Sequence, residues 1–118
     1  MKGDDLKGRL REFALAIIGF YCGMPRTEEG RIIGRQFLKS GTSAGAHHRE
    51  AHRARSTAEF ISKMEGGLQE LDETDYWLDL VKAAGMAKGE TLEWLIRENS
   101  ELIAIFTASV KKAKSRND

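Results

Sequence analysis

The chain has 118 residues, of which 41% are hydrophobic and 31% charged, and its formal net charge is +1. These values are typical of one globular domain with a charged surface, and the near-neutral charge argues against strong global attraction to nucleic acid. The lone cysteine, Cys22, cannot form an intrachain disulfide. Because neither a signal peptide nor an apolar run long enough for a bilayer is present, we expect no membrane contact and a cytoplasmic location.

Four segments have helical periodicity, and the breaks between them fall at Pro25, at residues 52–57 and at Gly85. In the first, third and fourth segments, apolar side chains recur every three or four residues. The second begins in the same way, with Ile32, Ile33 and Phe37, and then changes to small residues. We expect helices over residues 4–22, 27–51, 57–84 and 89–114.

Four amphipathic helices with short connections predict one all-α domain over residues 1–118, an antiparallel up-down-up-down four-helix bundle. The third segment carries a second apolar stripe of Ile61, Leu68 and Trp77 beside its main stripe. A face of this width exceeds what one bundle needs to bury, so the pattern predicts self-association.

Seven consecutive small residues, Ser40–Ala46, lie in the second segment. A phosphate-binding loop is disfavoured, because the spacing of a P-loop and the preceding strand are both missing. We expect instead that small side chains let another helix approach closely, and that the hydroxyls bond back to carbonyls one turn earlier. Enlarging Ala44 or Gly45 should therefore disrupt packing rather than a binding site.

His48 and His52 are four residues apart, which is the spacing of metal ligands on one helix face. The segment lacks the His-Glu-x-x-His pattern, and no further Cys or His offers a third ligand. We therefore expect no metal and no cofactor, and we interpret both histidines as partly exposed, titratable members of a polar interface.

Charge is unevenly distributed between two segments. Residues 31–55 carry a net charge of +5, and residues 65–79 carry −6 without a Lys or Arg. Either the two segments pair with each other, within or between subunits, or the basic segment binds a phosphate backbone. The candidate phosphate contacts are Arg31, Arg35, Lys39, Arg49, Arg53 and Arg55.

No catalytic constellation stands out. The carboxylates of Asp72, Glu73 and Asp75 are dense on one helix, where such groups are usually solvated or salt-bridged. Trp77 and Trp94 are better interpreted as core or interface anchors than as a base-stacking platform. We therefore expect a protein that is not an enzyme.

One long pattern of residues resembles a known family. The matching residues are Gly34-Arg35-Gln36-Phe37-Leu38-Lys39-Ser40-Gly41-Thr42-Ser43-Ala44-Gly45-Ala46, then Glu50-Ala51, Ala54-Arg55-Ser56, Glu59-Phe60-Ile61-x-Lys63 and Glu70-x-x-Glu73-Thr74-x-Tyr76-Trp77-Leu78. They are similar to the bacterial "four helix bundle protein" family, first noticed as products of intervening sequences in large-subunit ribosomal RNA genes.

The resemblance implies a left-handed antiparallel bundle that assembles into a homopentamer. It also implies a link to accessory proteins of diversity-generating retroelements, which are basic pentamers that bind nucleic acid and a reverse transcriptase. The candidate subunit contacts are Ser40, Thr42, Ser43, His47, Glu50, Glu70, Glu73 and Trp77. The family usually has Asn where this chain has His47, so the contact geometry there is expected to differ.

These observations lead to one expected function and one alternative. We expect a non-enzymatic, homo-oligomeric bundle, pentameric by the resemblance, with a basic face for RNA or DNA. The alternative is a scaffold that binds another protein and no nucleic acid.

Overall fold

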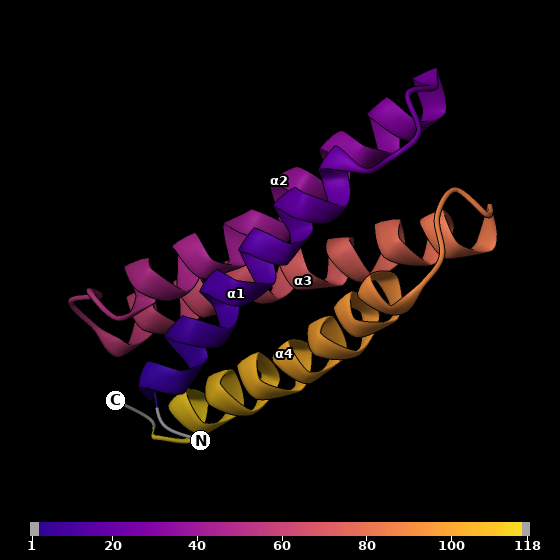
Figure 1. Ribbon diagram of the computed structural model, residues 1–118. Helices are drawn as coiled ribbons and strands as arrows, with labels where there is room; N and C mark the ends of the chain where they lie inside the picture. The colour runs from indigo at the N-terminus through magenta and orange to yellow at the C-terminus, as the bar shows by residue number, and fades with distance from the viewer. Residues whose placement is uncertain (1–2, 117–118) are drawn as a thin grey trace.

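The computed structural model describes residues 3–116, with side chains from residue 5 onward, and contains four helices in this range. They are α1 (Gly3–Cys22), α2 (Glu28–Ala51), α3 (Thr57–Ala83) and α4 (Glu90–Ser115) (Figure 1). Each end lies within one residue of the end expected from the sequence. No strand occurs among the described residues.

The helices form an antiparallel bundle in which each helix packs against its neighbours in chain order and α1 also contacts α4. Figure 1 shows the α1–α2 hairpin crossing the α3–α4 hairpin, with the two hairpin turns apart at one end of the molecule. The molecule is elongated, with principal extents of 49 × 25 × 20 Å. The fold is therefore the all-α four-helix bundle that the periodicity predicts.

Local signals in the sequence explain where the helices begin. The Thr27 side chain accepts a hydrogen bond from the amide of Gly30 and caps α2. Ser56 caps α3 by accepting from the amide of Glu59, and the Glu59 carboxylate accepts in return from the amide of Arg55. This reciprocal pair is a variant of the capping box. Gly89 precedes α4 with φ 120°, a conformation that L side chains rarely adopt.

The core consists of the apolar stripes that the sequence shows. The largest fully buried side chains include Phe13 and Ile17 of α1, Phe37 of α2 and Phe106 of α4. Stripes of period 3.6 put these residues on one face of each helix, and burial of these faces stabilises helices that would be marginal alone. Ile32 is an exception, because 49% of it is exposed.

Asn99 is one of the polar side chains buried in this core. Asn99 is fully buried, and its amide nitrogen donates to the carbonyl oxygen of Leu71 on α3 at 2.9 Å. This hydrogen bond joins α4 to the middle of α3. A buried amide with a specific partner fixes the relative register of two helices, because a shift along the axis would leave it unpaired.

The small-residue stretch of α2 brings two other helices close. A Cβ at Gly41 would lie 2.9 Å from two carbons of Ile17 on α1, so this glycine allows the approach. On the α3 side, the hydroxyls of Ser40 and Thr74 are 2.7 Å apart and buried. Because Thr74 already donates to the carbonyl of Glu70, Ser40 must be the donor in the pair. Close helix packing, as expected from the sequence, is the role of Ser40 and Gly41.

The sequence predicts that enlarging Gly45 disrupts packing, and this is wrong for the addition of a single Cβ. A Cβ there would lie 3.6 Å from the Cβ of Leu10, which is an ordinary van der Waals contact. Ala44, by contrast, is fully buried and leaves no room for a larger side chain. The stretch is therefore tight at Gly41 and Ala44 and less so at Gly45.

The two glycines give a matched pair of substitutions. Gly41→Ala should lower the free energy of unfolding by roughly 1–3 kcal/mol, because buried Ile17 must move. Gly45→Ala should leave it unchanged or raise it by up to about 1 kcal/mol through helix propensity. Urea unfolding followed by circular dichroism measures both. Equal effects of the two changes would contradict the packing described here.

Candidate functional site

The six candidate phosphate contacts all lie on the surface. Arg31, Arg35 and Lys39 follow one another at four-residue spacing along α2 and form the basic stripe. Arg49, Arg53 and Arg55 are exposed at the carboxyl end of α2 and in the turn after it, and we call them the basic end. Between residues 5 and 116, none of the six side chains makes an ion pair.

The acidic segment forms a second exposed surface, on α3. We call Asp72, Asp75 and Asp79, together with the exposed ring of Tyr76, the acidic face. The carboxylates of this face make no ion pair with any described side chain, and neither does Glu73. The six candidate phosphate contacts therefore form no ion pair with these carboxylates. Within the described chain, the basic segment meets the acidic segment at Glu70, which has His47 at 3.9 Å and is also influenced by the charge of Lys39.

His47 of α2 lies between two carboxylates and a notch in α3. Its ring nitrogens are 4.0 Å from Glu50 and 3.9 Å from Glu70, and Lys63 contacts Glu50 at 3.3 Å. A Cβ at Gly66 would lie 2.9 Å from the ring, so this glycine makes room for the imidazole. Sequence reasoning did not assign Gly66 to this role; two adjacent glycines inside an α-helix were the available signal.

Glu70 has a raised pKa in this cluster. Burial is the main cause, and the neighbouring carboxylate of Glu73 adds to it, while His47 and Lys39 act in the opposite direction. The structure thus brings together four candidate subunit contacts, His47, Glu50, Glu70 and Glu73, on adjoining parts of α2 and α3.

The three hydroxyl residues among the candidate subunit contacts bond within the chain. Thr42 donates to the carbonyl of Leu38 at 2.7 Å and Ser43 donates to that of Lys39 at 2.6 Å, as the sequence predicts. Ser40 is 1% exposed and is bonded to Thr74. The side chain of Ser40 is thus enclosed within the bundle, whereas Thr42 and Ser43 are half-buried at its surface.

Trp77, the remaining candidate contact, is half-buried and packs against the core beside Ile61 and Leu68. Its indole N–H has no hydrogen-bond partner among the described residues. The ring meets that of Tyr76 edge-on, with centroids 5.1 Å apart. The second apolar stripe of α3 is thus partly covered by the chain itself.

The interpretation of both histidines as partly exposed is wrong for His48. Only 2% of His48 is exposed, and neither ring nitrogen has a hydrogen-bond partner among the described residues. Burial lowers its pKa to about 4, with smaller contributions from the charges of His52, Arg49 and Lys7. His52 is exposed, and its ring lies 4.3 Å from that of His48. The sequence could not indicate that His48 is buried, because its burial depends on α1, whose Lys7 and Leu10 lie near this part of α2.

The described residues also show neither a membrane-spanning helix nor a cluster of metal ligands. None of the helices among them combines the length and apolar character that crossing a membrane requires. Within the same residues, no three Cys, His, Asp or Glu side chains gather into a group able to hold a metal ion.

The fold and these surfaces define a small four-helix bundle with separate basic and acidic faces. The model of the 23S rRNA-intervening sequence protein family matches residues 6–108. The chain therefore belongs to this family, as the resemblance indicates.

A solved structure agrees with this assignment. The chain is similar to a protein of unknown function from the S23 ribosomal protein family of Bacteroides thetaiotaomicron, with 33% identity and a TM-score of 0.86. The match covers 94% of this chain and 99% of that one. No curated protein matches the chain.

The buried imidazole predicts a pH-dependent stability. The folded protein keeps His48 neutral down to about pH 4, whereas the unfolded chain protonates it near its usual value of 6.5. The stability is therefore intact above that value and falls as the pH drops toward 4, by at most about 3 kcal/mol. His48→Phe should flatten the dependence, whereas His52→Gln should only reduce it in part, because burial is the larger cause of the lowered pKa and the charge of His52 a smaller one. Urea unfolding at several pH values measures it; parallel curves for wild type and His48→Phe would refute the assignment.

Proposed function

We propose that the chain is a non-enzymatic assembly protein that forms a homo-oligomer through the basic stripe of α2 and the acidic face of α3. The observation that carries the proposal is that no charged side chain of either surface forms an ion pair with a described residue. The basic stripe of one copy attracts the acidic face of another, whereas two basic or two acidic surfaces repel each other. Surfaces of opposite charge on different helices therefore favour contact between copies.

Each of the two surfaces also exposes an apolar side chain among its charges. Ile32 lies beside Arg31 on α2 and is 49% exposed, and Tyr76 lies beside Asp75 on α3 and is 56% exposed. Protein interfaces commonly combine an apolar centre with a charged rim, and tyrosine is enriched in them. Both surfaces therefore have the composition of contact surfaces.

A contact between two different surfaces is heterologous, so it repeats from copy to copy and closes into a ring where the rotation permits. The family resemblance supports five copies. The cluster of His47, Glu50 and Glu70 would lie near such a contact, because it joins α2 to α3 on the outside of the bundle.

A second part of the proposed function is nucleic-acid binding by the basic end. Arg49, Arg53 and Arg55 remain exposed and unpaired in a part of α2 separate from the basic stripe. Repetition around a ring would multiply this charge, which compensates for the near-neutral charge of a single chain. The alternative is a ring that recruits another protein through its outer surface and binds no nucleic acid.

Charge reversal tests the assembly. Arg31→Glu/Arg35→Glu and Asp72→Lys/Asp75→Lys should each lower the native mass measured by light scattering, because like charges then face each other. The chain with all four changes should regain the mass of the wild type. Arg97→Glu, a charge reversal at an exposed residue of α4 that belongs to neither surface, is the matched control. An unchanged mass in either double variant would reject the proposed contact.

Salt-dependent binding tests the basic end. If the end contacts phosphates, affinity for single-stranded RNA or DNA should fall steeply between about 50 and 200 mM salt. Arg49→Gln/Arg53→Gln should weaken binding and reduce the salt slope by roughly 1.4, and Arg97→Gln should do neither. Fluorescence anisotropy with labelled oligonucleotides measures both quantities. No binding by the wild type would leave the protein-scaffold alternative.

A further inference from the structure

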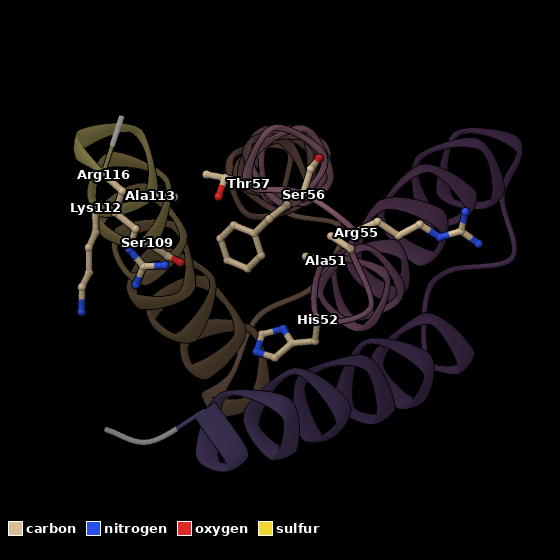
Figure 2. A pocket seen from close by; sticks show the side chains of 11 residues that line it. Ala51, His52, Arg55, Ser56, Thr57, Ser109, Lys112, Ala113 and Arg116 are labelled. Carbon is tan, nitrogen blue, oxygen red and sulfur yellow. The ribbon is translucent and has the colours of Figure 1, made fainter. Parts of the chain in front are cut away.

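A concavity of about 560 Å³ lies at the end of the bundle where α2 ends, α3 begins and α4 ends. Figure 2 shows the side chains that line it. Its wall includes Ser56 and Thr57 at the start of α3 and Ser109 of α4. His52 and Arg116, the residues that follow α2 and α4, complete this part of the wall. Pockets of a few hundred Å³ accommodate small organic ligands, so the space is large enough for one nucleotide.

The lining of this pocket is strongly basic. Arg55, Lys112 and Arg116 contribute cations, and no Asp or Glu is among the described residues that line the pocket. Neither Lys112 nor Arg116 makes an ion pair with a described residue. Figure 2 shows Arg55 extending away from α4, with the guanidinium of Arg116 beside Ser109. The cations available to a ligand in the pocket are therefore those at the carboxyl end of α4.

The start of α3 adds to this positive potential. Ser56 and Thr57 line the pocket, and α3 runs for 27 residues from Thr57. The amino end of a helix carries partial positive charge that favours anions. At this end, Ser56 accepts from the amide of Glu59, and the Glu59 carboxylate accepts from the amide of Arg55. Together with the two cations at the carboxyl end of α4, the amino end of α3 makes one side of the pocket suited to a phosphate group.

The lining of the pocket also includes two flat rings, those of Phe60 and His52. Phe60 is half-buried in the lining, and its ring centroid is 6.2 Å from that of His52. The Nδ1 atom of His52 is 3.2 Å from the carbonyl oxygen of His48; a carbonyl only accepts, so Nδ1 carries the hydrogen. The opposite ring nitrogen, Nε2, is thereby left to a ligand. Aromatic rings of this kind stack on nucleobases with little dependence on sequence.

We propose that this pocket binds a single nucleotide. Lys112, Arg116 and the start of α3 hold its phosphate, and Phe60 and His52 contact its base. The nucleotide is either free in solution or the phosphorylated end of an RNA or DNA strand. The inference rests on the proposed function for a strand end as the source, whereas binding of a free nucleotide depends on the pocket alone.

The first experiment titrates the full chain with AMP, adenosine and inorganic phosphate, and follows backbone amide shifts by NMR. AMP should shift the amides of His52, Thr57 and Ser109, and it should bind at least about tenfold more tightly than either part alone, because base stacking and phosphate contacts add. Phosphate that binds as tightly as AMP would overturn the assignment of a nucleotide.

Two variants test the residues. Lys112→Gln/Arg116→Gln should weaken AMP binding by about tenfold or more through the loss of two charge-assisted contacts. Lys111→Gln, which removes one positive charge from a neighbouring residue outside the pocket lining, should leave it unchanged. Phe60→Leu should reduce AMP binding toward that of phosphate, with helix content by circular dichroism confirming the fold. Wild-type affinity for AMP in the double variant overturns the proposal.

Oligonucleotides distinguish the sources of the ligand. A 5′-phosphorylated hexanucleotide that displaces AMP, when its unphosphorylated form does not, identifies a strand end; displacement by neither identifies a free nucleotide. The two proposals fail separately. If the chain binds long RNA but not AMP, the pocket proposal is rejected and RNA binding by the basic end stands. If it binds AMP but not RNA, the pocket proposal stands and RNA binding by the basic end is rejected.

Discussion

Close packing of α2 against both of its neighbours is the constraint on which the rest of the molecule depends. Gly41 allows Ile17 of α1 to approach on one side, and Ser40 donates to Thr74 of α3 on the other. Because both contacts involve side chains with few atoms, the helix axes come close and the long apolar residues at either end can interdigitate. The same packing directs the cations of α2 outward, where no described partner neutralises them.

At His47, too, the packing of α2 against α3 combines a large side chain on one helix with a glycine on the other. The imidazole occupies space that Gly66 of α3 leaves free, whereas a Cβ at the next residue, Gly67, would collide with Phe106 of the core. The ring then lies within 4.0 Å of carboxylates from both helices. Burial of Glu70 raises its pKa, so this cluster couples protonation to the geometry of the α2–α3 pair.

Charge is organised by helix in this protein, and that organisation links the proposed roles. The basic stripe and the acidic face lie on different helices and remain unpaired within the described chain. The ends of α2 and α4, by contrast, meet the start of α3 in a pocket whose described lining residues include cations and no Asp or Glu. A ring that assembles through the basic stripe and the acidic face would contain one such pocket in each subunit. One nucleic-acid chain could then contact several pockets at once, which strengthens binding even if each pocket binds weakly.

The sequence alone determined the helices, their ends and most of the core, because period 3.6, the capping residues and the glycines act over a few neighbouring residues. The family resemblance was also available from the residues. The tertiary structure decided which small residues are tight, since only the position of Ile17 separates Gly41 from Gly45. It likewise decided that His48 is buried beside an exposed His52. Helical spacing puts both histidines on one face, but only the packing of a distant helix determines which of them loses contact with water.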